Sequence, residues 1–273
     1  MPMTLCLTLR RATLVPLEVE GITPDTTAGK SLAEIERMPV YEGNVQAALG
    51  DFFQVRGDPA DRRHRWEGDL RGVHWIGAGM TDGEIVIEGS AGRHVGSQMR
   101  GGTILVLGDV SDWVGAEMRG GLIRVQGRAG HLVGSAYRGS PRGMTGGTIC
   151  VGGDAGNEIG HSLRRGLIAI GGGIGDLAGM NMLAGSILVL GTCGIRHGAG
   201  MRRGTLAFLG AAPPLLPTFR PACRFRPVIL RVIFRYLRQV GFAVPEELET
   251  TACELYHGDL LCGGRGEVLL RAV

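Results

Sequence analysis

Apolar and polar positions follow one repeating pattern along residues 76–210, and this pattern occurs seven times. Each copy opens at a glycine, reaches Met or Leu, passes a second glycine, and then alternates apolar and variable positions up to a third glycine. The opening glycines lie nineteen residues apart except for one step of twenty-six: Gly77, Gly96, Gly115, Gly134, Gly160, Gly179 and Gly198. The longer step indicates a seven-residue insertion within Tyr137–Gly143. A fixed period of this size predicts a solenoid of stacked repeats.

The alternating stretch of each repeat has the pattern of a short β-strand. Residues 102–108 read Gly-Thr-Ile-Leu-Val-Leu-Gly, and branched side chains dominate the equivalent positions elsewhere. A nineteen-residue unit with glycine corners cannot hold a pair of helices, and it lacks the leucine spacing of a leucine-rich repeat. The pattern therefore predicts an all-β fold, a parallel β-helix. We expect it to be right-handed, because parallel crossovers almost always are.

Residues one repeat apart should lie above one another at a spacing of about 4.8 Å, which predicts three buried columns. The first column contains Ile85, Ile104, Ile123, Ile149, Ile168, Ile187 and Leu206. The second contains Ile87, Val106, Val125, Val151, Ile170, Val189 and Phe208. The third contains Met80, Met99, Met118, Met144, Leu163, Met182 and Met201. Three such side chains per repeat contribute about 1.5 to 3 kcal/mol each, which outweighs about 0.5 to 1 kcal/mol per glycine.

The repeats divide the chain into three predicted parts, residues 1–72, 73–210 and 211–273. Residues 1–72 should form an N-terminal cap, because an open solenoid end would expose the apolar columns. We expect a pair of strands in residues 1–22, a short helix after Thr26, and a degenerate coil at residues 52–57. The charged run at residues 58–65 is predicted to be a solvated loop.

Residues 211–273 should form a C-terminal extension. A helix is expected to begin at Pro227 and to bury one apolar face: Ile229, Leu230, Ile233, Phe234 and Leu237. We predict that this helix closes the far end of the stack as a lid, with its arginines in solvent. Binding to a membrane surface is the alternative that a basic amphipathic helix raises. Residues 266–270 should form a final strand.

Composition excludes several partner classes. The formal net charge is only +3, so bulk charge does not indicate a nucleic-acid partner. No run of eighteen apolar residues occurs, and two arginines interrupt the apolar N-terminus, so neither a membrane span nor a signal peptide is predicted. The six cysteines show no Cys-x-x-Cys spacing, which favours reduced thiols and a cytoplasmic location.

Catalytic and metal-binding patterns are weak. The acidic residues scatter over different phases of the repeat, and the histidines near the opening glycines occur at shifting offsets. A β-helix enzyme needs converging carboxylates, and a stacked metal site needs neighbours in register. We assign no catalytic residue and no metal ligand, and we interpret the histidines as corner residues that make hydrogen bonds. Cys150, next to the inward position 149, is interpreted as a packed thiol.

One polar column is unusual. At the fourth position after the opening glycine, five repeats carry arginine: Arg100, Arg119, Arg138, Arg164 and Arg202. Like charges about 5 Å apart repel by roughly 1 kcal/mol in water, so a bare stack is unfavourable. The guanidinium groups can spread into solvent, pair with acids such as Glu117, or bind an acidic ligand or partner.

The repeat, with Ile76–Met80 at its start, resembles the C subunit of formylmethanofuran dehydrogenase and of the bacterial formyltransferase/hydrolase complex. The glutamate synthase large subunit shares the repeats, so the flanking segments narrow the resemblance: Gly43-Asn44, Phe53-x-Val55-x-Gly57, Leu216-Pro217-Thr218-Phe219 and Tyr256-His257-Gly258-Asp259-Leu260. The likeness covers nearly the whole chain. It implies a non-catalytic subunit that binds the formyltransferase and hydrolase-like chains and holds no cofactor of its own.

The resemblance also implies the reaction of the complex. Such complexes move a formyl group from tetrahydromethanopterin to a methanofuran-type carrier with a glutamate-rich tail, and release formate during formaldehyde oxidation. The carboxylates of this glutamate-rich tail could bind the guanidinium groups of the arginine column. Two alternatives stay open: a stand-alone β-helix enzyme that acts on polysaccharides, and a structural domain of the glutamate synthase type.

Overall fold

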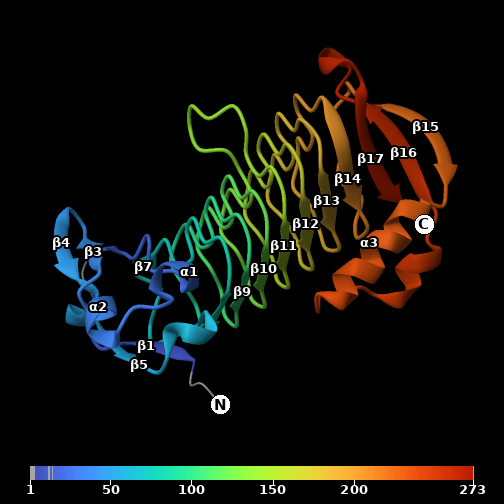
Figure 1. Ribbon diagram of the computed structural model, residues 1–273. Helices are drawn as coiled ribbons and strands as arrows, with labels where there is room; N and C mark the ends of the chain where they lie inside the picture. Colours follow the sequence, from blue (N-terminus) through green and yellow to red (C-terminus); the bar gives the residue numbers. More distant parts are fainter. Residues whose placement is uncertain (1–3, 12, 14, 273) are drawn as a thin grey trace.

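The protein is an all-β chain with few helices in the computed structural model, which describes residues 4–11, 13 and 15–272 (Figure 1). One sheet has thirteen strands in the order β15-β16-β17-β14-β13-β12-β11-β10-β9-β8-β6-β1-β5, and a second has the order β4-β3-β2-β7. The all-β prediction is confirmed.

Seven strands of the large sheet come from the seven repeats: β8 (Glu84–Glu88), β9 (Thr103–Val106), β10 (Leu122–Val125), β11 (Thr148–Val151), β12 (Leu167–Ile170), β13 (Ser186–Val189) and β14 (Arg203–Phe208). Each pairs in parallel with the next, and the paired residues are one repeat apart, as in Ile85 with Ile104. Isolated bridges form a second line of pairing, for example from Leu70 through Ala91 and Val110 to Ala129. Each repeat is thus hydrogen-bonded along two lines to the repeats on either side of it.

The interior of the stack contains the three predicted columns. All twenty-one side chains are at most 3% exposed, which confirms the inward assignment. The opening glycines are needed where the chain turns over these side chains. At Gly77, φ is +71° and a Cβ atom would lie 2.5 Å from Cδ1 of Ile104. A larger residue there would therefore clash with the core.

The N-terminal part extends the same sheet by a route that differs from the prediction. Strand β6 (Arg63–Glu67) pairs in parallel with β8, and β1 (Leu5–Leu9) pairs in parallel with β6. β6 begins within the charged run of residues 58–65 that was predicted to be a loop, so that prediction was wrong for residues 63–65. His64 and Trp66 are buried inward while the alternating arginines pair with Glu84 and Glu88, so the charges lie on the outer face of a strand.

The predicted degenerate coil is also placed differently. β5 (Phe53–Arg56) is antiparallel to β1 at the edge of the sheet, so it is no additional parallel turn. The strands predicted near the N-terminus exist but join different sheets, since β2 (Leu17–Glu18) pairs with β3 (Pro39–Glu42) and β7 (Val73–His74). Residues 1–3, 12 and 14 of that prediction lie outside the described residues.

The remaining N-terminal elements form a small cap: α1 (Pro24–Thr27), α2 (Leu32–Glu36), β4 (Val45–Ala48) and the 3-10 turns η1 (Leu49–Asp51) and η2 (Pro59–Asp61). Ser31 caps α2, because its side chain accepts a hydrogen bond from the backbone N–H of Glu34.

The C-terminal part contains α3 (Val228–Gln239) between β15 (Arg220–Phe225) and β16 (Cys253–Gly258), followed by β17 (Arg265–Arg271). The 3-10 turns η3 (Glu246–Thr250) and η4 (Leu260–Cys262) lie on either side of β16. β17 pairs in parallel with β14 and continues the stack, which confirms the final strand.

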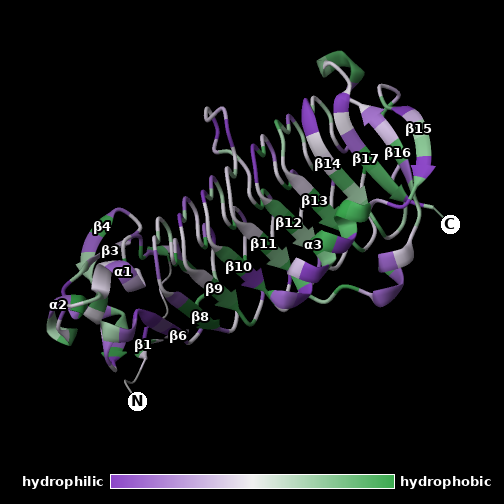
Figure 2. Cartoon of the chain, turned by 45° about the vertical axis from the view of Figure 1, so that its right-hand side comes forward, coloured by the Kyte–Doolittle hydropathy of each residue, from purple (hydrophilic) through white to green (hydrophobic). Residues whose placement is uncertain are grey.

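The prediction that the helix closes the end of the stack was wrong. α3 lies along the outer face of the last turns (Figure 2), where Leu230, Phe234 and Leu237 pack in one buried cluster with outward residues of β11 to β14 and β17. The interior beyond the last repeat is packed instead by Leu216, Phe219 and residues of β17. The helix lies on the side because the outward positions there are small or apolar, Cys150, Ala169, Leu188 and Ala207, and need a cover.

Candidate functional site

The arginine column lies on the surface of the stack. Arg100, Arg119 and Arg202 are exposed and Arg164 is half-buried. The backbone register brings only Arg100 and Arg119 into adjacent turns, because the N–H of Arg119 bonds to the carbonyl of Met99 as that of Arg100 bonds to Met80. None of the four forms an ion pair with a residue of the described chain.

Arg138 does not lie in this column. The N–H of Thr145 bonds to the carbonyl of Met118, and the N–H of Arg164 bonds to that of Met144, so Thr145 occupies the place that spacing gave to Arg138. Arg138 is exposed in the insertion loop, which projects from the stack between β10 and β11 (Figure 1). Arg138 precedes the insertion in the sequence, but the insertion loop carries its side chain away from the column. Leu183 interrupts the column again between Arg164 and Arg202.

A column of aromatic rings on another corner was missed by sequence reasoning. Trp75, His94 and Trp113 lie two residues before successive opening glycines, with φ between +63° and +68°. Trp75 and His94 stack with ring centroids 4.1 Å apart, and Tyr137 of the insertion loop stacks on Trp113 at 5.0 Å. Bulky residues rarely adopt positive φ, and the corner of the repeat imposes it, since Leu132, Leu177 and Arg196 at the same position also have φ between +63° and +64°. Stacking adds an attraction among the aromatic side chains. Their common nineteen-residue spacing was the signal that could have revealed them.

Tyr137 fastens the insertion loop to this stack through hydrogen bonds. Its hydroxyl donates to Oγ of Ser97 at 2.9 Å and lies 2.9 Å from Nδ1 of His94, while Ser97 donates to the carbonyl of Trp113. Burial lowers the pKa of His94 to about 4 and raises the pKa of Tyr137 to about 12. Both groups are therefore neutral near pH 7, which suits a structural anchor better than proton transfer.

Several acidic side chains that seemed scattered in the sequence lie at the corners of the repeats, where they contact the equivalent corner of the next repeat. Oδ1 of Asp109 accepts the backbone N–H of Arg128 at 2.7 Å, and Oδ1 of Asp154 does the same for Gly173. In a neighbouring column, Asp112 accepts from His131, and Nδ1 of His131 accepts from Asn157. These side chains tie one turn to the next, as was expected for the corner histidines.

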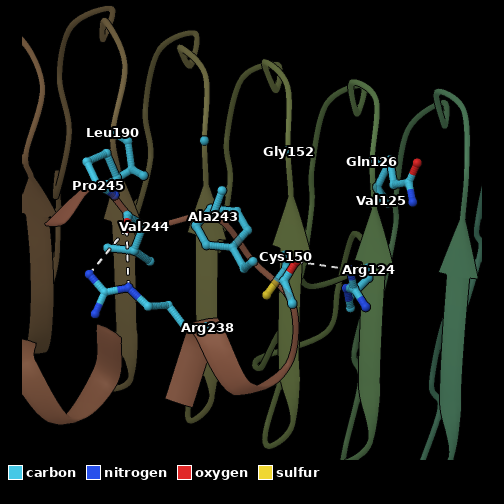
Figure 3. A pocket seen from close by; sticks show the side chains of 13 residues that line it. Arg124, Val125, Gln126, Cys150, Gly152, Leu190, Arg238, Ala243, Val244 and Pro245 are labelled. Atoms are coloured by element: carbon cyan, nitrogen blue, oxygen red, sulfur yellow. Dashed lines mark hydrogen bonds between the residues drawn. The ribbon is translucent and has the colours of Figure 1, made fainter. Parts of the chain in front are cut away.

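A groove of about 840 Å³ lies between the sheet and the loop after α3 (Figure 3). Arg124 donates to the carbonyl of Gly241 at 3.0 Å on one side, and Arg238 donates to the carbonyl of Val244 on the other. Cys150 lies at its base with a side chain that is 2% exposed, and burial raises the pKa of its thiol to about 12. The thiol is thus protonated and packed, in agreement with the interpretation of Cys150 from the sequence.

Residues 4–11, 13 and 15–272 contain no group of three or more His, Cys, Asp or Glu side chains that could hold a metal ion. None of the helices in that part of the chain has the length and apolar character needed to cross a membrane.

Curated relatives match a minor part of the chain. It is 45% identical over 79 residues to the C subunit of the molybdenum-containing formylmethanofuran dehydrogenase 1 of Methanothermobacter thermautotrophicus, which is 29% of this chain and 20% of that one. It is 42% identical over 85 residues to the C subunit of the tungsten-containing enzyme 2 of Methanothermobacter wolfeii, 30% of this chain and 32% of that one. The matched region thus spans between a fifth and a third of these relatives. No family model matches.

A solved structure matches along nearly the whole length. It is the crystal structure of the formyltransferase/hydrolase complex of Methylorubrum extorquens with methylofuran. The TM-score is 0.90 and the identity 32%, and the match covers 98% of this chain and all of the solved chain. This chain therefore belongs to the family formed by the C subunit of formylmethanofuran dehydrogenase and its counterpart in formyltransferase/hydrolase complexes.

Proposed function

We propose that this chain is a non-catalytic scaffold subunit of a formyltransferase/hydrolase complex. The complex would transfer a formyl group from formyl-tetrahydromethanopterin to a methylofuran-type carrier and hydrolyse the formyl carrier to formate. The observation that carries the proposal is the full-length match to a chain of such a complex at 32% identity. The partner subunits would supply the chemistry.

The architecture proposed for this scaffold is a right-handed parallel β-helix at residues 73–210, with a cap at residues 1–72 and an extension at residues 211–273. The parallel register of one repeat per turn and the three buried columns support it. A rod of this kind stacks identical turns and offers long, stiff surfaces to partners. The side chains that could suggest chemistry have structural partners, since His94, His131 and Asp112 bond within the stack.

The proposed place of action is the cytoplasm, where thiols stay reduced. All six cysteines are free, including Cys150 and Cys253 in buried positions.

The column of Arg100, Arg119, Arg164 and Arg202 is proposed to hold the acidic tail of the carrier or an acidic partner surface. Four guanidinium groups without acidic partners in the described chain support this assignment, because a guanidinium group can donate two parallel hydrogen bonds to one carboxylate. The double variant Arg100→Glu/Arg119→Glu should weaken retention of methylofuran on the complex about tenfold or more at low salt. Arg138→Glu/Arg142→Glu, with the same charge change in the loop, is the control. Equal loss in both variants would contradict a role of the column.

The scaffold role is tested by purifying the native complex through a tag on this chain. Mass spectrometry should identify the formyltransferase and hydrolase-like chains, and the isolated chain should release no formate from formyl-methylofuran. Reassembly without this chain should lower the yield of complex with little effect on the turnover of the complex that does form. Formate release by the isolated chain would refute the non-catalytic assignment.

A further inference from the structure

One side of α3 is apolar yet exposed. Val228 is 71% exposed, Val232 is 61% exposed and Ile229 is 59% exposed, and Tyr236 follows on the same side at 40%. Four of the twelve exposed large hydrophobic side chains of the described residues thus occur within nine positions of one helix. The sequence had placed Ile229 on the buried face. Clustered exposed apolar side chains of this kind mark a contact surface more often than scattered ones do.

We name these four residues the outer stripe of α3. A helix advances 100° per residue, which puts the outer stripe on the side away from the buried residues Leu230, Phe234 and Leu237. The helix therefore has two apolar sides. The packing of the fold explains the buried side and, in the outer stripe, only the hydroxyl of Tyr236, which reaches back to Thr148.

Arginines border the outer stripe. Arg231 and Arg235 are exposed one turn apart, and Arg238 continues the same row and pairs with Glu249. The hydrogen bond from Arg238 lowers the pKa of Glu249, and the positive charges of Arg238, Arg231 and Arg235 lower it further. Arg231 and Arg235 form no ion pair in the described part of the chain. The surface thus offers apolar side chains next to free guanidinium groups.

The helix is held in place before any partner binds. Three buried side chains anchor it, Tyr236 bonds to Oγ1 of Thr148 at 3.0 Å, and Arg238 bonds to the carbonyl of Val244. A surface already fixed in position loses little conformational entropy on binding, which favours a stable interface.

We propose that the outer stripe, with Arg231 and Arg235, is the docking surface for a partner subunit that presents an apolar patch bordered by carboxylates. This proposal rests on the proposed function, which requires that the chain bind other subunits. A guanidinium group pairs with a carboxylate in a defined, bidentate geometry, so the arginines would set the orientation of the partner subunit. The outer stripe would supply most of the affinity.

A second copy of this chain fits the surface less well. A two-fold contact with the two helices antiparallel would bring the arginine row of one copy next to that of the other, and like charges would repel. Pairing through the neighbouring edge strand is also hindered, because β15 contains Pro221 and a register shift between Pro221 and Cys223.

The test compares variants of the full chain by their affinity for the other subunits of the complex. Ile229→Asp/Val232→Asp should reduce the affinity for the remaining purified subunits by about tenfold or more, measured by biolayer interferometry. Arg231→Glu/Arg235→Glu should reduce it less and should flatten the salt dependence. Val45→Asp, at a residue that is 61% exposed in β4 at the other end of the molecule, is the control and should change the affinity less than twofold.

The outcomes separate the two proposals. If the wild-type chain captures no formyltransferase or hydrolase-like subunit, the proposed function and the docking surface both fail. If the wild-type chain captures them and the Ile229/Val232 variant does so equally well, with melting temperatures unchanged, only the docking surface fails. Two further results would overturn it: a dimer of the wild-type chain that the variant loses in light scattering, or binding to phosphatidylglycerol vesicles that the variant loses.

Discussion

The outer faces of the early and late repeats differ although their inner faces are nearly identical. Strands β8 and β9 present the half-buried Val86 and Leu105 to the outside, and β10 presents Arg124. In the same register, β11 to β14 present Cys150, Ala169, Leu188 and Ala207, all at most 2% exposed. Helix α3 covers the second group and leaves the first open.

This difference teaches that the inner columns build the stack and the outer column decides what binds to it. Ala169 and Ala207 leave room for the large side chains of Phe234 and Leu237, whereas Arg124 ends the covered region by bonding to the carbonyl of Gly241. One residue per repeat therefore distinguishes a covered flank from a free one.

The largest effect is expected from removing the central side chain of the cover. Phe234→Ala deletes a ring that is fully buried and should lower the free energy of unfolding by about 3 to 5 kcal/mol. Hydrogen exchange should speed up in α3 and β12 to β14 and stay slow in β8 and β9. A uniform increase along the stack would contradict the local role of α3.

A smaller effect should come from placing a charge under the cover. Ala169→Arg inserts a long cation at a position with no exposed surface and should destabilise by about 2 to 3 kcal/mol through overpacking and desolvation. The matched variant Val86→Arg adds the same side chain to the open face and should stay within about 0.5 kcal/mol. Chemical denaturation measures both, and equal losses would show that the two faces are alike.

Arg124 tests the boundary between the faces. Arg124→Ala removes its hydrogen bond to the carbonyl of Gly241 and should cost about 1 kcal/mol. Arg128→Ala removes only an exposed pair with Asp109 at 3.8 Å and should cost about 0 to 0.5 kcal/mol. Thermal unfolding would distinguish them, and a loss at Arg128 as large as that at Arg124 would place the boundary elsewhere.

Acidification should destabilise the N-terminal half more than the C-terminal half, and this is the smallest of the expected effects. Burial lowers the pKa of His64 and of His94 to about 4, both in the N-terminal half, and it lowers the pKa of His197 in the C-terminal half. The unfolded chain binds more protons than the native one between about pH 6.5 and 4, so stability should fall as the pH falls through this window.

Because of this difference, the rate of backbone hydrogen exchange at pH 4.5 should rise more in β6 and β8 than in β13. His64→Gln should reduce the pH dependence of the melting temperature, and an unchanged dependence would show that His64 does not contribute to it.

Much of the fold was predictable because the repeat is a one-dimensional signal. A residue and its equivalent nineteen positions later must meet when each repeat makes one turn, so spacing alone identified inward residues such as Ile104 and Met99. The same logic failed at Arg138, since an insertion preserves order along the chain without preserving position in space. It also failed at residues 63–65, whose alternating strand was hidden by the charges on its outer face.

The sequence by itself determined the stacking period, the inward columns and the amphipathic character of residues 228–239. Only the tertiary structure decided that α3 lies against the side of the stack, that Tyr137 joins Trp113 and His94, and that the outer stripe stays exposed. Periodicity specifies which face of an element is apolar, but the surface that it covers depends on which neighbours leave apolar area and space to fill, and that is a property of the assembled turns.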